Sequence, residues 1–450
     1  MFRVNAADNP ARLLHDVGVS DHSRPVFRVA ARALAVGLAI VVAVAACGST
    51  SPTPPRSGTP TPVVAIMPTG TPMPVGTPAP SAQAIYPVPT SQPEPPAAAP
   101  AALLSTTTAT KLQAALNAAR AGGKLEGISA AVVFPDGSMW TGQSGTAILS
   151  GAKPVTANTL FSIGSISKTF VAALALRLAE QGTISLNDPL SKYVPTFPNA
   201  SHITLSELLD HRSGIRDVFD STSMDKAILS DPSRIWTVAQ VLARIGKPYF
   251  APGHGYTYSN TNYILLGLAI ETATRKTIAS LVRSEFLDPL GMKSTWFQPE
   301  EKVATTNFAH GYMNTASKPR DVSAGQKMLP YNSEATVAGT SGGFVSTASD
   351  LALWASALYG GGVLDEAELA SMIDVSPTLP YKPPYPYGFG FERATIAKQM
   401  AWGHRGHLDG FWSAMWYLPD FGITIVILTN DQWTNTQTVT AQLVQALLAK

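Results

Sequence analysis

The stretch FSIGSISKTF, residues 161–170, lies where an apolar, strand-like run gives way to a long apolar, helix-like run. Residues i and i+3 of a helix share one face, so we expect Ser165 and Lys168 to meet one turn apart. A serine hydroxyl is a weak nucleophile that needs a base within hydrogen-bond reach, and a lysine amine can act as that base. The unpaired N–H groups at a helix start can also stabilise an oxyanion. The stretch therefore predicts a reactive serine at the start of a buried helix.

The S-x-x-K pattern alone decides little, because it occurs three times, at Ser150/Lys153, Ser165/Lys168 and Ser223/Lys226. We expect the first copy in a loop and the third in a polar connection without a buried element. Only the second copy opens an apolar helix. The alternative for that copy is a serine N-cap followed by a solvated lysine.

Two later stretches complete a recognisable set. PGHGYTYSNTNYILLG, residues 252–267, contains Tyr-Ser-Asn, and AWGHRGHLDGF, residues 401–411, contains His-Arg-Gly. In this order the three motifs resemble those of the serine β-lactamase and penicillin-binding hydrolase family, in its branch of class C β-lactamases and D-alanyl-D-alanine carboxypeptidases. The stretch LLDHRSGI, residues 208–215, also matches the family's habits, and the resemblance extends over about residues 125–430.

The resemblance implies a role for each motif residue. Ser165 would form the acyl-enzyme, and Lys168 and Tyr258 would share proton transfer. Asn260 would hydrogen-bond Lys168 and the substrate's amide. A packed aromatic at Tyr258, and a turn or helix N-cap at Asn260, are the alternatives for these two residues.

The third motif implies the remaining contacts. His404 would be catalytic and give the site another potential cation, and the backbone N–H of His407 would form an oxyanion hole with that of Ser165. Arg405 and Gly406 would contact the substrate together with Asn260. Relatives usually carry Thr or Ser at the position of Arg405. The arginine either binds a substrate carboxylate or points away and leaves a site that prefers neutral esters.

Metal chemistry is not expected here. His404, His407 and Asp409 could be read as zinc ligands, but H-x-x-H on a strand places the two imidazoles on opposite faces. We therefore expect no metal and no cofactor. His211 in LLDHRSGI is expected to be structural and to fix a loop near the site.

Periodicity and turn signals predict an α+β fold. Helices are expected at 110–121, 165–181 and 439–449, and strands at 127–134, 138–145, 342–346, 389–393, 413–418 and 423–429. Strands at both ends of the domain imply one antiparallel β-sheet flanked by helices, with a mainly helical inserted subdomain at about 183–330. The resemblance implies the same β-lactamase/transpeptidase-like fold.

The first quarter of the chain reads differently. An apolar stretch at 33–46 follows three arginines and ends directly before Cys47, the only cysteine, which resembles a bacterial lipoprotein signal. We expect a signal peptide at 1–46, lipidation of Cys47, a Pro/Thr/Ser/Ala-rich tether at 47–105 and a hydrolase domain at 106–450. Sixteen of the 36 prolines fall between residues 48 and 100, which favours an extended tether.

These features predict an extracytoplasmic, lipid-anchored serine hydrolase, held to the cell membrane and expected to be monomeric. The net charge of +2 provides no basic surface for nucleic acid. The leading hypothesis is a D,D-carboxypeptidase acting on peptidoglycan stem peptides. A class C-like β-lactamase, an esterase or D-amino-acid amidase acting on a small molecule, and a non-catalytic penicillin-binding or sensory module are the alternatives.

Overall fold

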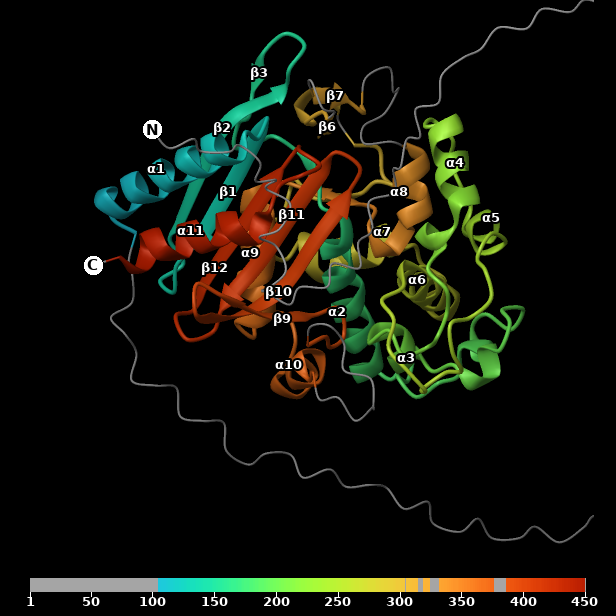
Figure 1. Cartoon of the computed structure of the whole chain (residues 1–450). Helices are drawn as coiled ribbons and strands as arrows, with labels where there is room; N and C mark the ends of the chain where they lie inside the picture. Colours follow the sequence, from blue (N-terminus) through green and yellow to red (C-terminus); the bar gives the residue numbers. More distant parts are fainter. Residues whose placement is uncertain (1–103, 304, 315–318, 324–331, 376–385, 450) are drawn as a thin grey trace, which may run out of the picture. The chain divides into compact units, whose positions relative to one another are not determined.

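The computed structural model of the protein describes residues 104–449 apart from 304, 315–318, 324–331 and 376–385 (Figure 1). The expected signal peptide at 1–46, the lipidated Cys47 and nearly all of the tether at 47–105 lie outside the described residues. Within the described ranges, none of the helices has the length and apolar character needed to cross a bilayer.

The largest sheet of the described residues has seven antiparallel strands in the order β3-β2-β1-β12-β11-β10-β9. The strands are β1 (Gly127–Val133), β2 (Met139–Ile148), β3 (Lys153–Pro154), β9 (Glu392–Ile396), β10 (Gln399–Leu408), β11 (Phe411–Leu418) and β12 (Ile423–Thr429). β1 pairs with β12, from Ile128 opposite Thr429 to Val133 opposite Thr424. The prediction of one sheet built from both ends of the domain is therefore confirmed.

Helices cover both faces of this sheet, so β1 and β12 are buried along their whole length (Figure 1). The first and last helices, α1 (Thr106–Gly123) and α11 (Thr436–Leu448), pack on one face, where Leu116 and Leu443 are fully buried. On the other face α9 (Ala348–Tyr359) lies against β1 and β12. Phe170 of α2 (Ser167–Glu180) stacks on Trp354 of α9 with ring centroids 4.2 Å apart. Helix α2 thus runs through the core.

The described residues between 183 and 330 are mainly helical. The helices of this region and of the segments after it are α3 (Leu205–Leu209), α4 (Thr222–Ser230), α5 (Val238–Leu242), α6 (Asn260–Thr274), α7 (Ile278–Val282), α8 (Asn332–Ala338) and α10 (Glu366–Ile373). The insertion also holds the short strands β5 (Trp296–Phe297), β6 (Tyr312–Asn314) and β7 (Pro319–Asp321). β5 and β4 (Phe161–Ser162) both pair with β8 (Phe344–Ser346), which ties the insertion to the strand before Ser165.

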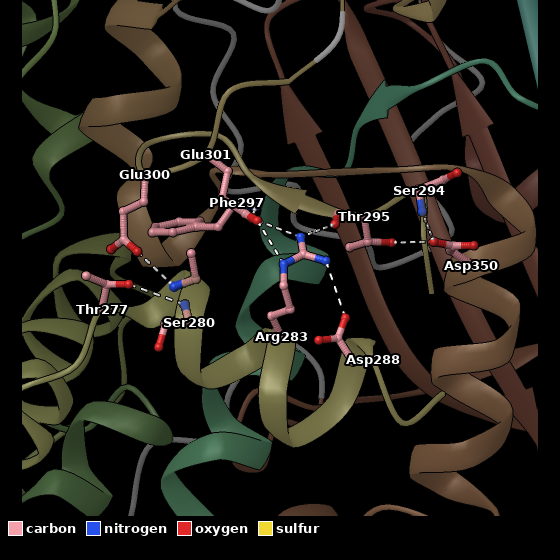
Figure 2. A network of polar contacts seen from close by, with 11 residues as sticks. Thr277, Ser280, Arg283, Asp288, Ser294, Thr295, Phe297, Glu300, Glu301 and Asp350 are labelled. Carbon is pink, nitrogen blue, oxygen red and sulfur yellow. Dashed lines mark hydrogen bonds and ion pairs between the residues drawn. The ribbon is translucent and has the colours of Figure 1, made fainter. Parts of the chain in front are cut away.

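A polar network fixes this small sheet (Figure 2). Arg283 follows α7 and donates to the Thr295 carbonyl oxygen at 3.2 Å and, through Nε, to Glu301 Oε1 at 3.1 Å. The Asp350 carboxylate of α9 accepts the backbone N–H of Ser294 at 2.7 Å and the Thr295 hydroxyl at 3.0 Å. The segment leading into β5 is therefore anchored from both the insertion and the helix on the sheet.

Three local expectations are corrected. The helix expected from Ser165 starts as a 3-10 turn at Gly164–Ile166, and α2 begins at Ser167. The strand expected at 389–393 lies three residues later as β9. The third S-x-x-K copy, expected in a connection, lies inside α4, because Met224 and Ile228 give that polar segment a buried side. Strand β10, which carries the His-Arg-Gly motif, was not among the expected strands.

Candidate active site

The turn that carries Ser165 lies directly against β10. Gly164 has φ +51°, and a Cβ atom there would lie 2.5 Å from the backbone nitrogen of His407. A Cβ atom on Gly406 would lie 1.9 Å from the carbonyl oxygen of Ile163. Only glycine permits such an approach of two backbones. The Ser165 turn and residues 406–407 therefore meet through main-chain contact, as an oxyanion hole made from Ser165 and His407 requires.

Lys168 is fully buried beneath Ser165. Its ammonium donates to Ser165 Oγ at 2.9 Å, to Asn260 Oδ1 at 2.7 Å and to the Ser341 carbonyl oxygen at 2.8 Å. These three acceptors match the three N–H donors of an ammonium group. The predicted contact between Ser165 and Lys168 one turn apart is confirmed.

The environment of Lys168 changes its acidity. Burial lowers the pKa of Lys168 from 10.5 to about 7, although the nearby Asp217 and Glu392 carboxylates raise it. Near neutral pH a large share of the amine is therefore uncharged. An uncharged amine has a lone pair and can accept the Ser165 proton.

Asn260 connects Lys168 to a carboxyl group that the sequence analysis missed. Its Nδ2 donates to Asp217 Oδ2 at 2.9 Å, while its Oδ1 accepts from Lys168. Asp217 also accepts the backbone N–H of Phe219 at 3.0 Å, and burial raises the pKa of Asp217. The signal that could have found Asp217 is its place two residues after LLDHRSGI. Asn260 is the first residue of α6. Its side chain points to Lys168 and does not cap the helix.

The Tyr258 ring lies beside the buried amine, with Lys168 Nζ 4.8 Å from its centroid. The His211 ring packs on Tyr258 at 4.3 Å between centroids. His211 Nδ1 accepts the backbone N–H of Ser259 at 3.2 Å and lies 3.1 Å from Asn262 Nδ2. His211 is fully buried and holds the Tyr258 loop in place, which is the structural role expected for it.

His404 differs from the expectation of a second cation. Its side chain is buried, with Nε2 3.0 Å from the Tyr387 hydroxyl and Nδ1 3.9 Å from Glu392 Oε1. Burial lowers the pKa of His404 to about 4, although Glu392 raises it. The imidazole is therefore neutral at neutral pH. The carboxylate and the tyrosine that determine this environment lie outside the motif.

Arg405 pairs with the same carboxylate. Its Nε donates to Glu392 Oε2 at 2.9 Å, and Glu392 is buried on the neighbouring strand β9. The guanidinium charge is thus compensated within the protein. Of the two readings of Arg405, this pairing favours a site for neutral groups over one that binds a substrate carboxylate.

A serine hydrogen-bonded to a buried lysine at the start of a core helix, beside an antiparallel sheet covered by helices on both faces, is typical of a β-lactamase-like α+β fold. The family model described as Beta-lactamase matches residues 112–450, and the chain belongs to this family. The expected fold and family are confirmed.

Curated relatives show how far the likeness extends. Penicillin-binding protein 4* of Bacillus subtilis (strain 168) is 29% identical over 307 residues, which cover 64% of this chain and 64% of that protein. Unguisins hydrolase ungD of Aspergillus violaceofuscus (strain CBS 115571) is 26% identical over 343 residues, which cover 69% of this chain and 59% of that protein. The chain therefore spans less than two thirds of the length of these relatives.

Among solved structures, the D-amino acid amidase from Ochrobactrum anthropi SV3 complexed with D-phenylalanine is similar to this chain with a TM-score of 0.67. The two are 28% identical, and the match covers 76% of this chain and 99% of the amidase chain.

Proposed function

We propose that this protein is a serine hydrolase that works through an acyl-enzyme on Ser165. The hydrogen bond between Ser165 Oγ and the buried Lys168 amine, with its pKa of about 7, carries this proposal. The neutral amine takes the hydroxyl proton as Ser165 attacks the substrate carbonyl carbon. The backbone N–H groups of Ser165 and His407 stabilise the oxyanion. The proton then leaves on the departing amine or alcohol, through Tyr258 beside Lys168.

The second half of the reaction repeats these steps with water. A water molecule gives a proton to the neutral Lys168–Tyr258 pair and attacks the acyl-enzyme carbonyl. The bond to Ser165 Oγ breaks, the acid product leaves, and the proton returns to Ser165. Asn260, held by Asp217, keeps the lysine in place through both halves.

The substrate we propose is an amide or peptide of a D-amino acid with an uncharged leaving group. The similarity to the D-amino acid amidase supports the D-configuration, and the Arg405–Glu392 pair supports the uncharged leaving group. A D,D-carboxypeptidase of peptidoglycan stem peptides is the second candidate, supported by the similarity to penicillin-binding protein 4*. In that case the site must bind the substrate's carboxylate although Glu392 already compensates the charge of Arg405.

Covalent labelling tests the proposed mechanism. We expect a fluorescent penicillin or a fluorophosphonate to add its mass to the peptide that contains Ser165. A hydrolysis panel of D-phenylalanine amide, acyl-D-Ala-D-Ala, nitrocefin and p-nitrophenyl butyrate then separates the amidase, carboxypeptidase, β-lactamase and esterase activities. A stable adduct without turnover of any substrate indicates a penicillin-binding module. A protein that forms no adduct on Ser165 and hydrolyses none of the four contradicts the proposal.

We also propose that the protein is anchored outside the cytoplasm by a lipid on Cys47. The apolar stretch before Cys47 and the proline-rich segment after it support this proposal. Metabolic labelling with a radioactive fatty acid, compared between the natural chain and Cys47→Ser, tests it. Equal labelling of the two contradicts it.

The activity is expected to rise with pH through about 7, because Lys168 must lose its proton to act as a base. The Asp217 carboxylate raises the pKa of Lys168, so Asp217→Asn is expected to lower that pKa and move the rise in kcat/KM to lower pH. Rates measured from about pH 5 to 9 give the midpoint for each protein. Asp420→Asn, in the exposed turn before β12, is the control and should keep the natural midpoint. A midpoint that stays or moves to higher pH in Asp217→Asn contradicts this account.

A further inference from the structure

Strand β10 passes three parts of the site in order. His404 lies near Tyr258, with ring centroids 6.4 Å apart. Residues 406–407 lie against the Ser165 turn. Asp409 follows the last residue of the strand. A substrate whose carbonyl group sits at Ser165 therefore has the His404 end of β10 on one side and Asp409 on the other.

The Asp409 end carries an acidic cluster. The backbone N–H of Asp409 donates to Glu334 Oε1 of α8 at 3.0 Å, and Asp225 of α4 is close enough to influence both carboxyl groups. Burial raises the pKa of Glu334 well above its usual value and that of Asp409 to about 6, and the neighbouring carboxylates raise both further. The guanidinium of Arg320 lowers the pKa of Asp409.

One oxygen of this cluster lacks a donor among the described residues. Glu334 Oε2 is buried and has no hydrogen-bond partner in the described part of the chain, and the whole residue is only 7% exposed. A buried carboxylate oxygen without a donor is costly, so native proteins rarely keep one without a ligand or a proton. The orphaned oxygen is a second observation, independent of the clustering of acidic residues.

Two segments of the chain connect the cluster to the surroundings of Ser165, one through Ser341 and one through His407. Glu334 precedes Ser341 by seven residues of helical backbone, about 10 Å, and the Ser341 carbonyl accepts from Lys168. Asp409 lies two residues beyond His407, about 7 Å along an extended chain. The site is thus within reach of a small substituent on the substrate.

The position of the proton donor decides which half of the substrate reaches the cluster. A leaving group needs a proton, and under the proposed mechanism it receives one through Tyr258, which lies at the His404 end of β10. The leaving group therefore lies toward His404. The acyl half extends the other way, toward Asp409.

We propose that Glu334 and Asp409 form a subsite for a primary ammonium group on the acyl half of the substrate. This subsite rests on the proposed acyl-enzyme chemistry at Ser165. The ammonium supplies the N–H donor that Glu334 Oε2 lacks, and a charge-assisted hydrogen bond compensates the buried carboxylates. Among the described residues, the acidic group compact enough to hold a metal ion is a different one, at Glu180, Asp365 and Glu368. The chemistry at Glu334 therefore fits an amine and not a metal.

The test compares D-phenylalanine p-nitroanilide with its N-acetyl derivative, which lacks the positive charge. We expect the natural protein to have the higher kcat/KM on the free amine. Glu334→Gln should lower the ratio of the two kcat/KM values by roughly tenfold or more. Asp409→Asn should also lower this ratio, and it replaces Glu334→Gln in the test if that variant does not fold. Glu368→Gln, a similarly buried glutamate at the start of α10, is the control and should keep the natural ratio.

A pH series gives a second readout. Protonation of Asp409 should raise KM for the free amine below about pH 6, while KM for the N-acetyl compound stays constant. If turnover is too slow, the rate at which a fluorophosphonate labels Ser165 in the presence of each compound gives the same comparison. Labelling of Ser165 with no preference for the free amine, or with an equal ratio in all variants, overturns the subsite alone. Absence of both labelling and hydrolysis overturns the proposed function, and the subsite with it.

Discussion

Ser165→Ala is expected to lower kcat/KM by a factor of roughly 10³ or more, whereas Ser223→Ala should leave it unchanged. Both serines stand three residues before a lysine on a helical segment, so their local geometry is alike. They differ in environment. Ser165 Oγ accepts from a fully buried Lys168, while Ser223 and Lys226 are exposed and the Ser223 hydroxyl pairs with Ser221 at 2.8 Å. Of the two lysines, Lys168 is the one buried against its serine, so we expect Ser165 and not Ser223 to be activated.

Steady-state kinetics on the best substrate of the panel, together with melting temperatures, check this prediction. The Ser165→Ala protein should remain folded, because the substitution removes one oxygen at the surface of the site. Full activity in Ser165→Ala, or an equal loss in Ser223→Ala, contradicts the assignment of the nucleophile. Intact mass after incubation with a penicillin gives an independent check, since only the Ser223→Ala protein should take the label.

The comparison of these two serines shows how far the sequence pattern predicts the site. Helical spacing is enough to predict that Ser165 and Lys168 touch. It also places Ser223 near Lys226, where the serine- and aspartate-rich sequence predicts a polar connection without a buried element. Burial separates the two pairs. The burial of Lys168 depends on the packing of α2 against α9. The i, i+3 spacing does not predict that packing.

The parts of the site that the sequence did not predict are contacts between distant segments. Asp217 meets Asn260 from 43 residues away, and Glu334 meets Asp409 from 75 residues away. Neither carboxylate belongs to a motif that requires it. The acidity of His404 likewise depends on burial and on Glu392 of the next strand. These features follow from the completed fold and not from local spacing.

The same distinction applies to the fold. Strand β12, ITIVILT, is rich in β-branched residues and lies where it was expected, at 423–429. Strand β10, QMAWGHRGHL, has no β-branched residue and contains two glycines, so β-propensity does not indicate it. The structure gives the reason, since Gly406 is needed for the close approach to Ile163 and the neighbouring residues form the site. Local preferences commonly fail where function determines the residues.

The contact between the Ser165 turn and β10 gives the second large effect. Gly164→Ala is expected to lower kcat by roughly a hundredfold, because the new Cβ atom would lie 2.5 Å from the nitrogen and 2.7 Å from the oxygen of the His407 backbone. Neither main chain can accept this atom without moving. The displacement separates the two N–H groups that are proposed to bind the oxyanion.

Gly406→Ala tests the same contact from the other side, since its Cβ atom would lie 1.9 Å from the Ile163 carbonyl oxygen and 2.3 Å from Ser413 Oγ. Gly182→Ala is the matched control. Gly182 also has a positive φ, +70°, but no atom lies within 4 Å of its added Cβ. It should therefore lose about 1 kcal/mol of stability from backbone strain and keep its kcat. If all three variants lose stability and keep kcat alike, the close approach of Gly164 to His407 serves packing alone. A loss of kcat confined to Gly164→Ala and Gly406→Ala shows that this backbone contact positions the groups around Ser165.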